Sequence, residues 1–179
     1  MKPGINIAIG ALLLALASTN PALAHVTLAV PTATPGTGYK AVLRVPHGCD
    51  GAATTGIRVQ IPEGYIAVKP MPKPGWSIAI KTGTHAQSYQ LFGSAVTSGV
   101  TELDWTGGNL PDAYYDEFVM SGQIDGNLKV GSKLYFPVLQ ECGTTVERWI
   151  MVPAAGQATD DDLKTPAPAL TLIPATAKP

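Results

Sequence analysis

The run Tyr39-Lys40-Ala41-Val42-Leu43-Arg44-Val45 carries the clearest structural signal in this chain of 179 residues, because apolar and polar side chains largely alternate along it. The same alternation recurs in Gly56-Ile57-Arg58-Val59-Gln60-Ile61 and in Trp76-Ser77-Ile78-Ala79-Ile80-Lys81. Successive side chains of a β-strand point to opposite faces. A period of two therefore predicts strands with one face packed inward and the other in water.

The rest of the chain extends this pattern into a whole domain. Pro and Gly punctuate the sequence, and no segment keeps a helical apolar period for three turns. Further strands are expected at 26–30, 65–69, 87–92, 100–106, 115–124, 133–140 and 145–152. We expect an all-β fold, an immunoglobulin-like or cupredoxin-like β-sandwich of about seven to nine strands in two sheets.

The amino-terminal end has the features of a secretory signal. Lys2 supplies positive charge, residues 5–17 form an apolar run, and Ala22-Leu23-Ala24 is a small-x-small cleavage site. The apolar run is short for a membrane span. We therefore expect residues 1–24 to be a cleaved signal peptide and the protein to be periplasmic or secreted.

The carboxy-terminal end changes character from about Ala154. An acidic run at 160–162 is followed by alternating Pro and Ala at 165–169. Such composition offers few core-forming residues. The expected organisation is one domain at 25–153 and an extended or disordered tail at 154–179.

Charge and motifs exclude several functions. The net charge is −1 and charged residues make up 14% of the chain, so nucleic acid is not expected as a partner. The sequence has no nucleophile elbow, no phosphate-binding glycine loop and no zinc-type cysteine pairs. We do not expect an enzyme.

Cys49 and Cys142 are the two cysteines of the chain. Export places them where disulfides persist, and an even count favours a bridge between them. Their spacing also permits a thiolate copper site as an alternative.

The residue exposed by cleavage is His25. Its free amine and ring Nδ1 can bind one metal together, and an α-amine gives up its proton easily near neutrality. Nitrogen donors in this arrangement suit Cu(II). The strand-like run Val26–Pro31 would tie this terminus to a sheet. The alternative is that His25 is only the residue that happens to follow the cleavage site.

Several motifs spread through the domain resemble those of one known family. They are His25-Val26-Thr27, Arg44–Gly51 with Thr54-Thr55, Val59–Gly64, Lys69–Trp76, Trp105–Pro111, Tyr115–Phe118, Tyr135–Cys142 and Arg148-Trp149. The chain resembles YcnI-like proteins, in the version found in proteobacteria.

This resemblance implies a cupredoxin-like copper-binding domain. In such proteins Cu(II) is held by a brace on a single histidine, with a carboxylate as a further ligand and a tryptophan beside the metal. His25 matches the brace residue. The family glutamate is missing here, so Asp50 is expected to replace it, with His47 as a second candidate. Trp149 best matches the tryptophan, and Trp105 is the alternative.

The function implied is copper trafficking or homeostasis, with copper transport or resistance proteins, or a membrane-associated protein, as partners. Two alternatives stay open: a copper-dependent oxidase or monooxygenase-like enzyme, and a metal-free adhesion or assembly module. His85 lies in a polar segment and is expected to be an exposed turn residue.

Overall fold

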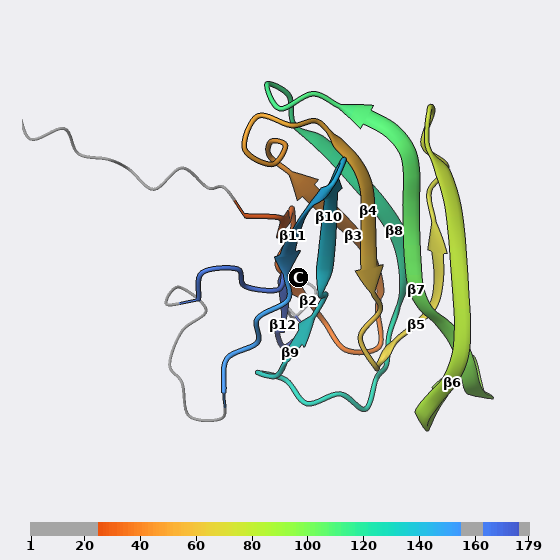
Figure 1. Ribbon diagram of the computed structural model, residues 1–179. Helices are drawn as coiled ribbons and strands as arrows, with labels where there is room; N and C mark the ends of the chain where they lie inside the picture. The colour runs from red at the N-terminus through yellow and green to blue at the C-terminus, as the bar shows by residue number, and fades with distance from the viewer. Residues whose placement is uncertain (1–24, 155–162, 176–179) are drawn as a thin grey trace, which may run out of the picture.

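The structure is a computed structural model, and it describes residues 25–154 and 163–175. These residues form twelve strands in three sheets and no helix (Figure 1). The predicted all-β sandwich is therefore confirmed. No membrane-spanning helix is found in the described ranges.

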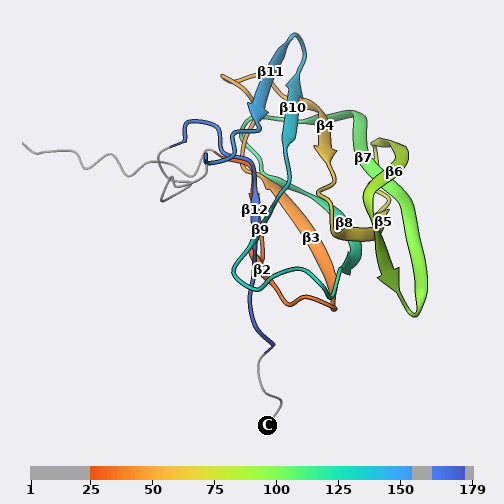
Figure 2. The same ribbon diagram turned by 90° about the horizontal axis from the view of Figure 1, so that it is seen from below.

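The two larger sheets form the layers of the sandwich. In order, the four-stranded sheet contains β1 (Thr27–Leu28), β3 (Gly38–Val45), β8 (Asp116–Ile124) and β5 (Tyr65–Pro70). The five-stranded sheet contains β11 (Thr145–Trp149), β10 (Val138–Cys142), β4 (Thr54–Gln60), β7 (Ser94–Leu110) and β6 (Ser77–Leu91). Figure 2 shows the β10–β11 and β6–β7 hairpins at opposite ends of this second sheet.

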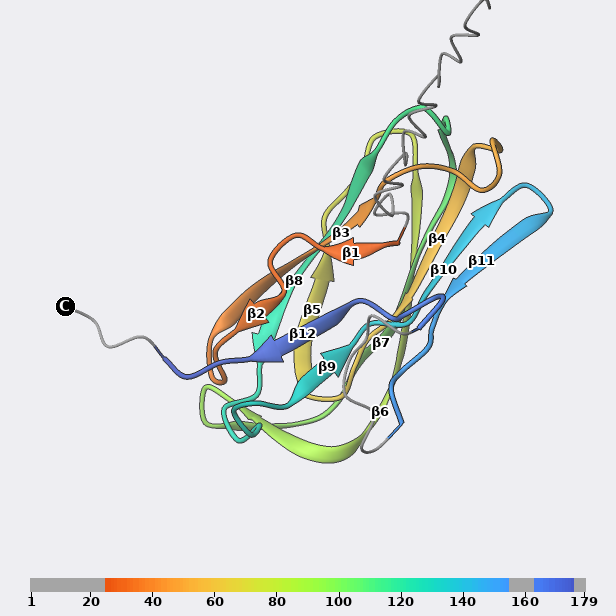
Figure 3. The same cartoon turned by 90° about the vertical axis from the view of Figure 1, so that its left-hand side faces the viewer.

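A third, smaller sheet accounts for most of the strands that exceed the expected seven to nine. It contains β2 (Thr32–Ala33), β12 (Ala169–Leu172) and β9 (Lys133–Tyr135), in that order (Figure 3). Strand β2 has two residues and is too short to show a period of two, and β12 lies in the segment expected to be a tail. Strand β9 falls within the strand expected at 133–140.

The alternation in β3 has the expected structural result. Ala41, Leu43 and Val45 are fully buried, while Lys40 and Arg44 on the opposite face are exposed. The strand pairs with β8 along its whole length. One apolar face is thus turned toward the second sheet.

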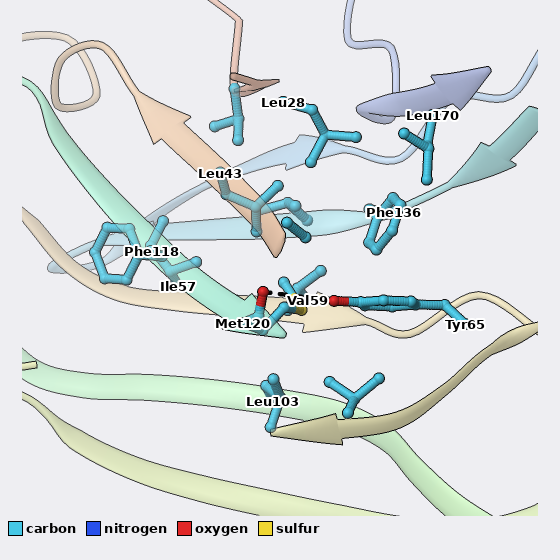
Figure 4. Packing of buried hydrophobic residues seen from close by; sticks show 14 of the residues in the cluster. Leu28, Leu43, Ile57, Val59, Tyr65, Leu103, Phe118, Met120, Phe136 and Leu170 are labelled. Atoms are coloured by element: carbon cyan, nitrogen blue, oxygen red, sulfur yellow. Dashed lines mark hydrogen bonds between the residues drawn. The ribbon is translucent and has the colours of Figure 1, made fainter. Parts of the chain in front are cut away.

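The core lies between the two layers. Figure 4 shows side chains of both sheets in one cluster, including Leu43 and Phe118 from one layer and Val59 and Leu103 from the other. The Trp105 ring packs edge-on against Phe118, with centroids 5.6 Å apart. Trp105 is completely buried and belongs to this core.

The predicted end of the domain at residue 153 is wrong. Leu170 and Leu172 of β12 are fully buried in the main core, and Leu163 and Ala167 before them are also buried. Strand β12 pairs in parallel with β2 and antiparallel with β9. The few apolar residues of this segment are spaced so that one face of a strand fills the core, and the domain therefore includes 163–172.

The cysteines form the predicted disulfide. Cys49, in the loop before β4, is bonded to Cys142 at the end of β10, with their Cα atoms 5.9 Å apart. A thiolate copper site is thereby excluded, since both sulfur atoms are in the bridge. The predicted signal peptide at 1–24 lies outside the described residues and stays a prediction.

The expectation for His85 is also wrong. It lies within β6, where the pairing with β7 shifts register between Thr84 and Tyr89, and its side chain is buried. The ring packs edge-on against Tyr89, and its Nδ1 is 3.5 Å from Glu63 Oε2. The irregular register turns this polar residue toward the molecule, which composition alone does not predict.

Candidate metal centre

His25 is held at the start of the folded domain. Val26 and Leu28 are buried in the core, and β1 pairs with β3 so that Thr27 lies opposite Arg44. The N–H of Ala29 donates to the carbonyl of Val42 at 2.9 Å, which extends the pairing. The amino-terminal segment is thus tied to a sheet, as the sequence predicted, and His25 itself is half-buried.

The ring of His25 lies against Trp149. The two ring centroids are 5.3 Å apart with planes inclined at 60°, an edge-on contact. Trp149 ends β11 in the five-stranded sheet and is only 5% exposed. Of the two tryptophans considered, Trp149 therefore borders His25, whereas Trp105 packs against Phe118 in the core.

A buried glutamine that the sequence analysis missed supports this contact. Gln140 of β10 is 1% exposed, and its Oε1 accepts a hydrogen bond from Trp149 Nε1 at 3.0 Å. Its Nε2 donates to the carbonyl of His47 at 2.7 Å and to Thr54 Oγ1 at 2.8 Å. A polar residue at an inward position, between Val138 and Cys142, was the signal available in the sequence.

His47 presents one ring nitrogen for coordination. Its Nδ1 lies 2.5 Å from the carbonyl oxygen of Gly48. A carbonyl oxygen only accepts hydrogen bonds, so Nδ1 is the donor in this contact, and in the neutral ring the lone pair is then on Nε2. The adjacent Gly48 N–H donates to Asp112 Oδ1 at 3.0 Å, which fixes the loop from a second side. His47 is thus a preorganised half-buried imidazole.

Asp50 is placed differently. It lies at the tip of a turn in which Cys49 and Ala52 exchange main-chain hydrogen bonds of 2.9 and 3.0 Å. Its backbone is left-handed, with φ of 48°, and the residue is exposed. Asp and Asn tolerate this conformation better than most residues, so the turn itself explains an aspartate here.

Among residues 25–154 and 163–175, no three side chains of His, Cys, Asp or Glu gather as a metal-binding group. A site built entirely from side chains, such as a structural zinc site, needs such a group. A histidine brace has a different requirement, because its main-chain amine supplies one of the nitrogen donors.

Two shallow grooves flank His25. One, of about 390 Å³, is lined by Thr27, Arg44, Pro46 and Tyr115 as well as His25. The other runs along β1 and is lined mainly by apolar residues, including Pro31, Pro166 and Pro168. A small ion or a partner protein can therefore approach His25 from two sides.

These features define a class of protein: a β-sandwich in which a histidine beside the first strand packs against an indole from the opposite sheet. The chain belongs to the DUF1775 family, described as a domain of unknown function, whose model matches residues 25–172. The YcnI-like copper-binding domains belong to this family. The match includes β12, in agreement with the corrected domain boundary.

A solved structure also resembles the chain. It is an uncharacterized protein from Nocardia farcinica, whose crystal structure reveals an immunoglobulin-like fold. The two are 26% identical, with a TM-score of 0.60, and the match covers 83% of this chain and 98% of that one. The fold is accordingly immunoglobulin-like, as predicted. No curated protein matches the chain.

Proposed function

We propose that this protein is an exported copper-binding protein that holds Cu(II) through His25 and takes part in copper trafficking or homeostasis. The observation that carries the proposal is the contact of the His25 ring with the Trp149 indole, beside grooves open to solvent. The family supports it, since YcnI-like copper-binding domains are members.

The chemistry depends on cleavage after Ala24. Before cleavage the nitrogen of His25 belongs to a peptide bond and is a poor ligand. Afterwards it is an amine, and amine and Nδ1 chelate one ion. Cu(II) heads the affinity order of the divalent first-row metals and accepts such nitrogen donors in a tetragonal arrangement. Binding occurs at the surface in the periplasm or outside the cell.

A further ligand is supplied by the loop that precedes β4. His47 offers Nε2 on a ring whose tautomer is fixed by Gly48. Asp50 offers a carboxylate from an exposed turn. Trp149 offers no lone pair, because the nitrogen lone pair of an indole belongs to its aromatic ring and its N–H can only donate, here to Gln140. Trp149 therefore acts as an apolar wall that shapes the site and keeps water from one side of the metal.

Copper carried in this way is cargo. Two grooves beside His25 leave room for a copper transport or resistance protein to take or deliver the ion, including a protein held in a membrane. No catalytic step is part of the proposal.

The test uses a matched set of proteins: one that begins at His25, one with a single glycine added before His25, and His25→Ala. Cu(II) affinity is measured by competition with a chelator, and ligand geometry by electron paramagnetic resonance. Both changes should weaken binding by roughly a hundredfold or more, because His25→Ala removes the ring nitrogen and the added glycine moves the amine away from the His25 ring. Far-ultraviolet circular dichroism serves as the folding control. Equal affinity and equal spectra for the glycine-extended protein would refute the brace.

A further inference from the structure

We infer that Gln140 is the positioning residue of the copper site, holding the Trp149 indole against His25 and joining it to the main chain of His47. The inference rests on the proposed function for its copper-dependent part. Its structural part concerns the metal-free protein and stands on the three hydrogen bonds of one buried amide.

The direction of each hydrogen bond follows from the partner groups. An indole N–H can only donate and a main-chain carbonyl can only accept, so Oε1 must face Trp149 and Nε2 must face His47. The amide therefore has one allowed orientation. A residue with only donors or only acceptors could not connect these two partners.

Because Gln140 is buried, its amide needs hydrogen-bond partners inside the protein. A buried amide without partners destabilises the folded state, and Gln140 is 1% exposed in a strand whose inward neighbours are Val138 and Cys142. An apolar side chain at this position would fill the core but leave the buried Trp149 N–H and the part-buried His47 carbonyl without these bonds. The glutamine thus provides hydrogen bonds that both Trp149 and His47 need.

The network continues from Gln140 to the disulfide. Thr54 Oγ1 accepts from Gln140 Nε2, so the hydroxyl hydrogen of Thr54 is free to point at Cys142 Sγ, 3.7 Å away. The disulfide anchors the loop that carries His47. Gln140 therefore joins the Trp149 indole, which borders His25, to the loop that carries His47, and fixes the two relative to each other.

This geometry predicts what the residue does for copper. With its N–H held, the indole cannot rotate away from His25, and the face of the metal beside it stays apolar. With its carbonyl held, His47 keeps its ring near one position. Gln140 touches no metal in this scheme. It acts through Trp149 and His47, and so should govern the geometry of the bound ion more than the strength of the His25 chelate.

The test compares Gln140→Met, Gln140→Glu and, as a control on the outer face of the same strand, Glu141→Gln. In metal-free protein labelled with nitrogen-15, hydrogen exchange of the Trp149 indole N–H is measured, with a Trp149→Phe protein for assignment. Gln140→Met should accelerate this exchange about tenfold, the factor for one lost hydrogen bond. The buried indole of Trp105, which lies elsewhere in the core, should be unchanged in a folded variant.

In the copper-loaded proteins, Gln140→Met should change the electron paramagnetic resonance spectrum while affinity falls less than in His25→Ala. Gln140→Glu keeps an acceptor for the indole N–H but cannot donate to His47, so Trp149 should stay protected. Glu141→Gln should match the wild type throughout.

Unchanged Trp149 exchange in folded Gln140→Met would overturn the inference. If that variant does not fold, loss of Trp149 protection in folded Gln140→Glu, relative to the wild type, would overturn it instead, because the retained acceptor would then have no effect. Wild-type protein that binds no Cu(II) would refute the proposed function, whereas the exchange measurement would still test Gln140.

Discussion

At the scale of residues, the parts of the site differ in how they could be predicted. His25 follows from the cleavage site, and Trp149 from the resemblance to YcnI-like proteins. Gln140 was missed because alternation indicates only which face of the strand a residue occupies. The role of Gln140 depends on its hydrogen bonds to Trp149 and to His47, and His47 lies 93 positions away in the chain. Side-chain partners across a sandwich are set by tertiary packing, which a single sequence does not encode locally.

The two candidates for the further ligand differ in their surroundings. His47 is half-buried, and its carbonyl is bonded to Gln140, whose other end holds Trp149 beside His25. Asp50 is exposed at a turn tip. We therefore expect His47→Ala to weaken Cu(II) binding about tenfold or more, because it would remove a nitrogen ligand, and Asp50→Ala to weaken it less.

Competition titration of the two variants in the processed protein checks this order. Asp112→Asn is a useful companion, because it alters the loop that holds His47 without removing either candidate. A larger loss in Asp50→Ala than in His47→Ala would identify Asp50 as the ligand.

At the scale of elements, long strands were predictable and irregular ones were not. Strands β3 and β4 follow from their alternating side chains, and β8 and β7 cover the expected segments at 115–124 and 100–106. Strand β6 continues through a segment expected to be a turn, and β12 lies in the segment expected to be a tail. Strand β6 continues because it forms a long irregular hairpin with β7, the next strand, whereas β12 depends on β2 and β9, which are distant in the chain.

Glu63, in the turn before β5, accepts hydrogen bonds from β6, and the strength of this link depends on whether its carboxyl is ionised. Burial opposes ionisation of its carboxyl, but hydrogen bonds from Tyr89 Oη at 2.6 Å and from the Ala86 N–H at 3.2 Å, with His85 nearby, outweigh this, and the pKa of Glu63 is lowered. A lowered pKa in the folded state means that ionised Glu63 stabilises the fold above the ordinary pKa. This contribution is lost as pH falls through the folded value.

Glu63→Gln should therefore be less stable than the wild type above about pH 5, and the difference should shrink as the pH falls through the lowered pKa of Glu63 in the folded state. Because the side chain is 47% exposed, solvent screening keeps the effect small. Urea unfolding at a series of pH values measures it. A difference that grows as pH falls would contradict the assigned direction.

Strand β12 is expected to contribute strongly to stability. Leu170 is 0% exposed in the main core, so Leu170→Ala should lower the free energy of unfolding by about 2–5 kcal/mol, through lost apolar burial and a cavity. Val152→Ala, at an exposed position, is the matched control and should change it by less than about 0.5 kcal/mol. Equal small effects in chemical unfolding would show that β12 is not part of the cooperative core.

At the scale of the whole molecule, the proposed site forms where the two sheets of the sandwich pack against each other. His25 precedes a strand of one sheet and Trp149 ends a strand of the other, so the pair exists only when the two layers are packed. The class of the fold could be predicted because alternation and turn residues are repeated in many strands. The place where the layers bring a histidine and an indole together could not, because it depends on the relative position of the layers.

The disulfide should set both the stability of the molecule and the order of the site. Cys49 and Cys142 are separated by 93 positions, and closing a loop of this size stabilises the folded state by about 4–5 kcal/mol in the chain-entropy model. Cys49→Ala combined with Cys142→Ala should therefore lower the free energy of unfolding by about that amount. Urea unfolding under conditions that keep the wild-type bridge intact measures the change, and circular dichroism establishes that the variant still folds.

The same variant tests how the site depends on that anchor. The His25 chelate needs only the amine and its own ring, so tight Cu(II) binding should persist in folded protein without the bridge. The loop carrying His47 loses its covalent tie to β10, and the copper spectrum should shift toward that of His47→Ala. Because His47 still hydrogen-bonds to Gln140, adding Gln140→Met should complete the shift. A spectrum identical to the wild type in all of these proteins would mean that the loop does not reach the metal.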